Sequence, residues 1–373
     1  MENSFKVIRI WNIPIGVHPS WFLIFGLLTF SLATSLMPAE YPQLGNGMHW
    51  LLALATSLVF FLSVLAHELG HAYLALRNQV PVKGISLFFF GGVAQITQEP
   101  RTPGMEFKIA IAGPLVSLGL ALFFELTYLL DAQIPYLAAT SEYLARINLM
   151  LALFNMIPGF PLDGGRVLRS IVWKVSGDFK RSTWIASRVG QLVAFGFIGF
   201  GIYSALTAGL VNGLWLGFIG WFLLNAASSA YMQTTLQDRL EGVTVAQVMQ
   251  RNYPIVAGNM TLDRLVQEQV MTLGQQVFVV NGFEPDRRSG ILTLNDIKRQ
   301  PAQKWRFLTT EQAMIPWERL AQVNPDTPLL EALKKMEESG LIQVPVVNGS
   351  RVEGLVSREQ VLNYLRLRTE LGA

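Results

Sequence analysis

Six stretches of the chain are apolar over nearly the length that a membrane-spanning helix requires. An α-helix rises about 1.5 Å per residue, so about 20 residues cross the ~30 Å hydrocarbon core of a bilayer. The first and fourth stretches are short. We therefore predict six transmembrane helices, at about 20–36, 50–76, 106–130, 142–158, 186–207 and 209–231.

Two further stretches have the alternation and the β-forming residues of strands. FKVIRIWNIPIGV precedes the first apolar stretch, and VKGISLFFFGGVAQI lies between the second and the third. Glycine or proline interrupts both of them. Backbone that is not helical must pair or face water near a membrane, so we expect these strands to pair with each other or to line a wet cavity.

The chain after residue 233 is polar and repeats itself with a period of about 64 to 67 residues. Each repeat, at about 243–300 and 308–368, contains a Val-rich segment, VFVVNG or VPVVNG. Thr261 and Thr327 each precede an apolar periodic run and would cap its helix. The pattern predicts strand, helix, strand, strand and helix in each repeat, which is a small α/β motif.

Composition separates these two regions and limits the classes of function. Apolar residues make up 51% of the chain and charged residues 15%, against about 25% charged in soluble chains, and the mean hydropathy is +0.36. We predict a transmembrane domain at 1–233 and a soluble domain at 234–373. The absence of cysteine excludes disulfides and Cys-ligated metal sites. The net charge of +3 is modest, so we expect no nucleic-acid partner.

Lysine and arginine are concentrated on one side of the predicted helices. The loops after the first and fifth apolar stretches contain neither, whereas the N-terminal stretch and the segment at 166–188 are rich in them. Loops with many positive charges remain in the cytoplasm. We therefore expect a multi-pass protein of the cytoplasmic membrane, with both termini in the cytoplasm and no signal peptide.

The sequence HELGH lies inside the second predicted helix. His67 and His71 are four residues apart, so they project from one helical face about 6 Å apart and can bind one Zn²⁺. Glu68 between them can reach a water on that metal and act as general base. Ionisable groups deep in a membrane cost about 2.5 kcal/mol or more each, so three within five residues indicate a compensating metal.

A third zinc ligand must come from elsewhere, and the apolar region contains few acids. Asp163 lies in NMIPGFPLDGGR, where prolines and glycines break the fourth predicted helix and turn the chain. That turn would return a carboxylate to membrane depth, on the side where His67 lies. We predict Asp163 as the third ligand and one zinc per chain.

These motifs resemble the site-2 protease family of intramembrane zinc metalloproteases. The resemblance rests on HELGH at 67–71 and on the Asn-x-x-Pro-x-x-x-x-Asp-Gly pattern at 155–164. VHPSW, FFFGG and AGPLVSLG extend it over about residues 5–231. It implies cleavage of single-pass membrane proteins in the bilayer, with both histidines and Asp163 on zinc and Glu68 as base.

The resemblance also implicates Asn155 in the active site. Its amide would hold the substrate strand or the developing oxyanion, or it would cap the broken helix end. His18, at the first membrane boundary, is expected to pack at the interface rather than to take part in catalysis. The ISLFFFGGVAQI hairpin would accept an unwound substrate by β-addition, or only cover the site.

The two soluble repeats resemble CBS domains, regulatory modules that occur in pairs and commonly bind adenosine nucleotides. GILTLNDI matches the family's Gly-h-h-Thr/Ser-x-x-Asp pattern, in which Thr293 would contact phosphate and Asp296 the ribose. The second repeat has Ser357 but carries Gln360 in place of the acid. Nucleotide binding, formation of a homodimer and docking on the protease domain all remain open for this pair.

The sequence therefore predicts a polytopic α-helical membrane protein with short membrane-associated strands, followed by a soluble α/β tandem CBS domain. The expected function is an intramembrane zinc metalloprotease regulated through its CBS domains. CBS pairs also occur on ion channels and transporters, but that alternative leaves HELGH and Asp163 unexplained. A catalytically inactive scaffold is the other alternative, and the intact Glu68 argues against it.

Overall fold

The computed structural model describes residues 4–43, 45–96, 98–130, 134–281, 290–348 and 351–371. The chain divides into two compact units, Met1–Thr235 and Leu236–Ala373. Residues 282–289, which fall inside the first predicted repeat, lie outside the described residues.

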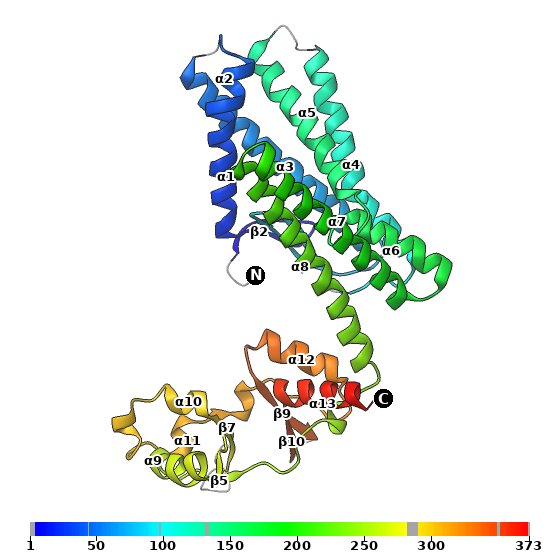
Figure 1. Cartoon of the computed structure of the whole chain (residues 1–373). Helices are drawn as coiled ribbons and strands as arrows, with labels where there is room; N and C mark the ends of the chain where they lie inside the picture. Colours follow the sequence, from blue (N-terminus) through cyan, green and yellow to red (C-terminus); the bar gives the residue numbers. More distant parts are fainter. Residues whose placement is uncertain are drawn as a thin grey trace. The chain divides into compact units, whose positions relative to one another are not determined.

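The N-terminal unit is built on long helices (Figure 1). Helix α1 (Pro19–Ser31) continues through a π-helical turn at Leu32–Leu36 into α2 (Met37–Glu40). The remaining helices are α3 (Asn46–Arg77), α4 (Pro103–Leu130), α5 (Pro135–Asn155), α6 (Asp163–Ser176), α7 (Phe179–Thr207) and α8 (Leu210–Leu240). Among the described residues, five stretches are long and apolar enough to cross a membrane: Pro19–Glu40, Asn46–Arg77, Pro103–Leu130, Phe179–Thr207 and Leu210–Leu236.

Five of the six predicted membrane segments thus coincide with such helices. The fourth segment forms α5, which is helical over 21 residues but is not among the five apolar stretches. Its first half is polar and includes Glu142 and Arg146, which form an ion pair within the helix. The hydroxyl of Tyr41 donates a hydrogen bond to Glu142 at 2.9 Å. The polar half of α5 is therefore satisfied within the protein.

The two predicted strand regions form one four-stranded sheet in the order β1 (Phe5–Ile10), β2 (Ile13–Val17), β3 (Val82–Phe88) and β4 (Gly91–Ile96). Strands β1 and β2 form one antiparallel hairpin, and β3 and β4 form another. Parallel pairing of β2 with β3 joins the two hairpins, so the strands pair with each other as expected. Ile13, Ile15 and Ile85 of this sheet pack on Ala72 of α3.

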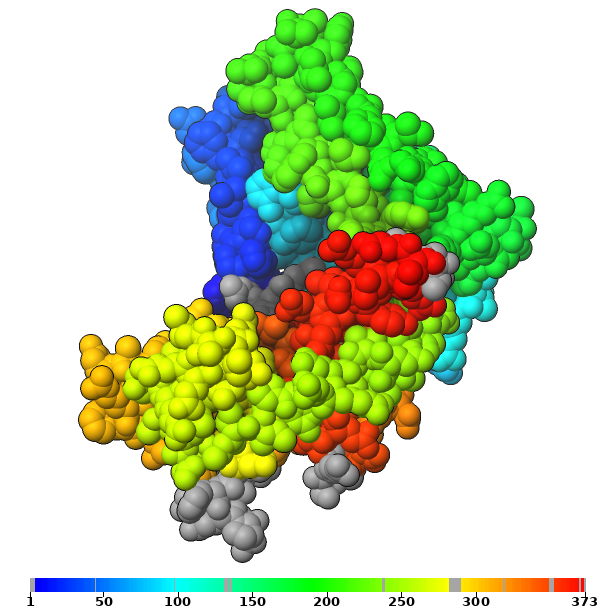
Figure 2. Space-filling model, turned by 60° about the horizontal axis from the view of Figure 1, so that its bottom comes forward, coloured from blue at the N-terminus to red at the C-terminus, as the bar shows by residue number. Residues whose placement is uncertain are grey.

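Small residues mediate the close approach of helices in this unit. The buried positions of α7 are serine, threonine, alanine and glycine, whereas large apolar side chains such as Leu192 and Phe200 are exposed. A Cβ added to Gly201 would lie 2.7 Å from the backbone nitrogen of Gly217, so α7 and α8 contact each other directly. Figure 2 shows them as adjoining green surfaces. This arrangement suits a lipid environment, in which helices associate through close packing.

The C-terminal unit contains two apolar cores on small α/β elements, and a third cluster joins them through Val279, Ile291, Leu320 and Leu355. The first core includes Phe278, Leu292 and Leu262 and lies on the sheet β5 (Ile255–Ala257), β6 (Val277–Asn281), β7 (Gly290–Thr293) and β8 (Ile315–Pro316). Its short helices are α9 (Leu262–Leu265), α10 (Leu294–Lys298) and α11 (Thr310–Ala313).

The second core of this unit includes Val344, Val356 and Leu329, and Leu240 at the end of α8 packs in it. It is built from α12 (Leu329–Glu338), β9 (Gln343–Asn348), β10 (Arg351–Ser357) and α13 (Arg358–Glu370). The Val-rich segments singled out in the sequence form β6, an inner strand of the first sheet, and β9, one of the two strands of the second.

Candidate active site

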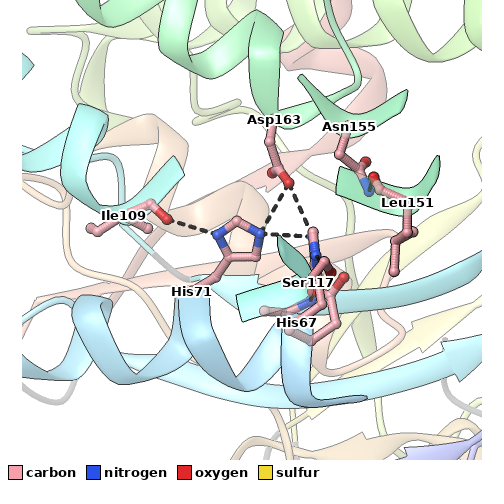
Figure 3. Close-up of polar contacts among 9 residues, drawn as sticks. His67, His71, Ile109, Ser117, Leu151, Asn155 and Asp163 are labelled. Carbon is pink, nitrogen blue, oxygen red and sulfur yellow. Dashed lines mark hydrogen bonds and ion pairs between the residues drawn. The ribbon is translucent and has the colours of Figure 1, made fainter. Parts of the chain in front are cut away.

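Three side chains from distant parts of the sequence meet at one point (Figure 3). Helix α3 contributes His67 and His71, which are 3% and 4% exposed, and the first residue of α6 contributes Asp163. The Nε2 atom of each histidine lies 3.1 Å from Oδ2 of Asp163. The two Nε2 atoms lie 3.2 Å apart. The structure therefore brings the three predicted ligands together.

The outer nitrogens of both imidazoles are held by fixed partners. Nδ1 of His71 donates to the carbonyl oxygen of Ile109 at 2.7 Å, because a carbonyl can only accept. The neutral ring of His71 then carries a lone pair on Nε2. Nδ1 of His67 lies 2.9 Å from the hydroxyl oxygen of the buried Ser117. Such partners orient the rings of metal-binding histidines and fix their tautomers.

The convergence of these atoms tests whether the site suits a metal. A lone pair on Nε2 of His71 and the carboxylate oxygen of Asp163 repel each other at 3.1 Å unless a proton or a metal ion lies between them. Zinc bonds of about 2.0–2.2 Å at tetrahedral angles place neighbouring ligand atoms roughly 3.3 Å apart. The observed separations fit that geometry. Two imidazoles and one carboxylate form a donor set that zinc accepts, with one coordination position left open.

Glycines on α4 leave room for this cluster. A Cβ on Gly113 would lie 2.2 Å from Nε2 of His71 and 2.6 Å from Nε2 of His67. One added methyl group would therefore occupy the space at the two metal-facing nitrogens. A Cβ on Gly70 of α3 would lie 3.1 Å from the carbonyl oxygen of Ala112, so α3 and α4 also approach closely here. Gly113 and Ser117 both belong to the AGPLVSLG segment.

Glu68 lies beside the cluster and faces the sheet. Its Oε2 atom accepts a hydrogen bond from the backbone N–H of Ala94 in β4 at 3.0 Å. A Cβ on Gly92 would lie 2.5 Å from Cγ of Glu68, so the glycine lets β4 run directly over this carboxylate. The described His, Asp and Glu side chains that can share a metal are His67, His71 and Asp163, which leaves Glu68 outside the ligand set.

Asp163 reaches the histidines because the chain turns tightly before α6. Gly159 has φ +132°, a conformation that glycine adopts readily. A Cβ on Gly164 would lie 2.4 Å from the carbonyl oxygens of Met156 and Ile157. The first turn of α6 can therefore pack against the turn that precedes it. These glycines and the broken helix were visible in the sequence.

The other two candidates of the transmembrane region have local partners. The amide of Asn155 donates to the carbonyl oxygen of Leu151 at 3.0 Å, at the end of α5 (Figure 3). His18 caps α1, since its Nδ1 accepts from the backbone N–H of Ser20 at 3.2 Å. The backbone N–H of His18 donates to Leu87 of β3 at 2.9 Å. His18 therefore joins α1 to the sheet and lies outside the ligand cluster.

Thr293 and Asp296 interact with each other in the C-terminal unit. They form a capping box at the start of α10, in which the Thr293 hydroxyl donates to Oδ2 of Asp296 at 2.5 Å. A separate cleft of about 970 Å³ lies in this unit. Among the described residues its lining includes Ser357 and Gln360 of the second repeat, but neither Thr293 nor Asp296.

The groups that support the metal-facing histidines carry little signal in the sequence. The Ile109 carbonyl is backbone, which carries no signal in residue type. Ser117 and Gly113 stand out in the sequence only as members of AGPLVSLG. That segment supports the family resemblance but gives no role to a single residue. The structure supplies those roles through the contacts above.

Comparisons with known proteins agree with this geometry. The chain matches peptidase family M50 over residues 55–133 and 130–197, and the CBS domain over residues 313–367. Two similar proteins carry the name "Putative zinc metalloprotease". They are sll0528 of Synechocystis sp., 38% identical over 98% of this chain and 96% of that protein, and Rip3 of Mycobacterium tuberculosis, 32% identical over 98% and 93%.

A solved structure is also similar to this chain. The site-2 protease from Methanocaldococcus jannaschii is 30% identical, and the match covers 61% of this chain and 95% of that one with a TM-score of 0.41. The likeness to the two relatives extends through both units. His67, His71 and Asp163 all lie within the residues that match family M50. The chain therefore belongs to peptidase family M50, the site-2 protease family of membrane metalloproteases, and carries a CBS domain in its C-terminal part.

Proposed function

We propose that this chain is a zinc endopeptidase that hydrolyses transmembrane protein substrates within the membrane, near its cytoplasmic face. One observation carries the proposal. The nitrogens of His67 and His71 and an oxygen of Asp163 lie 3.1–3.2 Å from one another in an apolar helical unit, with Glu68 directly beside them. Family membership supports the same chemistry.

In the proposed reaction, His67, His71 and Asp163 hold one zinc ion per chain. Bound zinc would lower the pKa of a water toward 7 and polarise the scissile carbonyl. Glu68 would accept the proton from that water and return it to the leaving amine. The N–H of Ala94 holds one carboxylate oxygen of Glu68, which keeps this side chain beside the cluster and in one orientation.

We propose Asn155 as an accessory group in this site. Its Nδ2 is engaged with Leu151, which leaves the amide oxygen and the second N–H hydrogen as groups that could meet a substrate. The side chain lies at the end of α5, directly before the turn that leads to Asp163. Capping of this helix end is the competing interpretation, and an Asn155→Ala variant that cleaves at the parental rate would favour it.

We infer that α5 is a sixth membrane crossing. Helix α4 passes the site at Ile109 and continues to Leu130, about 30 Å further at about 1.5 Å per residue. Asp163 lies beside His71 again, so the chain between them must return over the same distance. The 21 residues of α5 supply that length. Both termini and the C-terminal unit would then lie in the cytoplasm, in line with the distribution of lysine and arginine.

The sheet offers a place for an unwound substrate. Strand β4 lies at the edge of the sheet, next to β3, and its residues Gly92 and Ala94 contact Glu68. A substrate helix must lose its own hydrogen bonds before cleavage, and an edge strand can replace them by β-addition. We propose that an extended segment of a single-pass membrane protein binds along β4, within reach of Glu68.

We propose that both repeats of the C-terminal unit are CBS domains and regulate cleavage. The two apolar cores, one for each repeat, and the repeated Val-rich strands support a tandem arrangement. An adenosine nucleotide at Thr293 and Asp296 would act through differential binding to two forms of the enzyme. Calorimetry with an adenosine nucleotide, together with cleavage assays in the parent and in Asp296→Ala, tests this. No binding at millimolar nucleotide would leave the unit as a docking module or as a homodimer interface.

The experiment that tests the protease itself uses living cells. Membrane proteins are compared between cells that contain the parental chain and cells that contain Glu68→Gln. We expect specific single-pass proteins to accumulate uncut in the variant and to appear as shorter fragments with the parent. Identical protein profiles in the two strains would contradict a protease and favour a transport or scaffold function.

A further inference from the structure

A second group of buried charges lies outside the candidate active site, between α4 and α6. Arg169 of α6 is 5% exposed and Glu106 of α4 is 0% exposed. Nε of Arg169 donates to Oε1 of Glu106 at 2.6 Å, and Nη2 of Arg169 contacts the same oxygen. Nη2 also donates to Oε2 of Glu99 at 3.1 Å. The proposed chemistry uses none of these three residues.

Aromatic rings enclose the guanidinium group on two sides. Its central carbon lies 5.0 Å from the ring centre of Phe160 and 4.6 Å from that of Phe179. Phe160 belongs to the turn before α6, and Phe179 begins α7. Arg169 therefore links the start of α4, the turn before Asp163 and the start of α7. A lysine has neither the planar fork nor the stacking surface for these contacts.

The ion pair completes a closed ring of contacts around the metal-facing atoms. His71 donates to Ile109 of α4, and Glu106 lies three residues before Ile109 on the same helix. Glu106 pairs with Arg169, which lies six residues after Asp163 on α6. Asp163 then returns to His71 at 3.1 Å. Each helix in this ring is a rigid spacer, so the ion pair sets where the first residue of α6 lies.

The first turn of α6 packs through its backbone, because Gly164 and Gly165 lie against the turn that precedes them. The ion pair of Arg169 adds a side-chain anchor further along the same helix. The charges themselves are costly to bury, because Oε2 of Glu106 is buried without a hydrogen-bond partner among the described residues. A well-packed apolar contact would stabilise the fold at least as well. The charged pair is better explained by the orientation it imposes than by stability.

We propose that Arg169 and Glu106 are positioning residues that hold the Asp163 carboxylate in register with His67 and His71. The proposal rests on the proposed zinc site. Groups that orient metal ligands typically change metal affinity by roughly 10- to 100-fold when they are removed. Loss of the pair should therefore weaken zinc binding in a chain that still folds.

The test uses the purified full-length chain in lipid nanodiscs. Zinc affinity is measured by competition with a chromophoric chelator, ligand geometry by the absorption spectrum of bound Co²⁺, and stability by thermal unfolding. The variants are Glu106→Gln, Arg169→Met and the double variant. Lys174→Met is the matched control, because it removes an exposed cation from the same helix.

We expect Glu106→Gln and Arg169→Met to bind zinc roughly 10- to 100-fold more weakly and to unfold at a lower temperature than the parent. The double variant leaves no unpaired charge of this pair, so it should regain thermal stability. Its zinc affinity should stay low and its Co²⁺ spectrum should stay altered. Lys174→Met should match the parent in all three measurements.

Two results would overturn the proposal. Parental zinc affinity in the single variants, or affinity that returns together with stability in the double variant, would make the pair a structural contact only. If a single variant fails to fold, the double variant alone decides between these outcomes. A parental chain that binds no zinc would refute the metal site itself, and the positioning role with it.

Discussion

Two carboxylates occupy similar places in the two units and have different partners. Asp163 begins α6 in the transmembrane unit, and Asp296 lies in the first turn of α10 in the C-terminal unit. Asp296 accepts from Thr293 and completes a capping box. Helix α6 has no side-chain cap at Leu162, and the Asp163 carboxylate faces two imidazoles instead. The Asp296 carboxylate therefore serves its own helix, whereas the Asp163 carboxylate is available for chemistry.

The surroundings explain the difference. In the C-terminal unit, apolar side chains fill the cores, and polar groups near them satisfy backbone N–H groups at helix ends. In the transmembrane unit, many large apolar side chains face outward, and the interior holds small and polar residues beside its apolar ones. Ionisable groups are expensive there and persist where they have partners or a function. An aspartate at the start of a helix therefore indicates a helix cap in the C-terminal unit and a functional group in the transmembrane unit.

Removal of Asp163 should have the largest effect. In Asp163→Ala we expect zinc to fall from about one per chain to a small fraction and cleavage to fall roughly 10³-fold or more, since a ligand is lost. Metal analysis of the purified protein and cleavage of a transmembrane substrate check this. Asp296→Ala is the matched control and should keep its zinc. Equal zinc content in the parent and in Asp163→Ala would mean that Asp163, like Asp296, is not a zinc ligand.

Glu68→Gln should separate metal binding from chemistry. The amide keeps the shape of the side chain and can still accept from Ala94, but it cannot act as a base. We expect the zinc content to remain parental while cleavage falls by roughly 10² or more. Cleavage near the parental rate would assign the base to another group. Loss of zinc in this variant would instead place Glu68 among the ligands.

Gly113→Ala should weaken metal binding through a single methyl group. The added Cβ would lie 2.2 Å from Nε2 of His71, so the ring must move or the helices must separate. We expect zinc affinity to fall by roughly 10- to 100-fold, as measured by chelator competition. Gly119→Ala on the same helix meets nothing within 4 Å and serves as the control. Equal affinity in the two variants would mean that the space at Gly113 is not needed.

The smallest of these effects is expected from a substitution in the C-terminal unit. Thr293→Ala removes one half of the capping box and should lower the free energy of unfolding of this unit by about 1 kcal/mol. Thermal unfolding of the full chain, followed by a probe in the C-terminal unit, measures it. Zinc content and cleavage without nucleotide should stay parental. A change in zinc content would instead show that the C-terminal unit affects the metal site of the transmembrane unit.

Sequence alone determined the features that depend on short-range pattern. Apolar length predicted the membrane helices, alternation predicted the strands, and the spacing within HELGH placed His67 and His71 on one helical face. The polar half of α5 falls short of a clear membrane signal because Glu142 and Arg146 lower its hydropathy, and its crossing is inferred from the position of Asp163. Glycines and prolines before Asp163 predicted the turn, and the depth of that turn indicated Asp163 as the partner of His67 and His71.

Only the tertiary structure decided which distant groups meet. Nothing in the local pattern of Arg169 or Glu106 distinguishes them from other charges on helices, because their pairing joins residues 63 positions apart. The carbonyl of Ile109 and the hydroxyl of Ser117 are equally ordinary in sequence, yet they orient the two imidazoles. Hydrogen bonds and close contacts depend on three-dimensional distance, and distance between remote segments is set by packing of the whole unit rather than by any one segment.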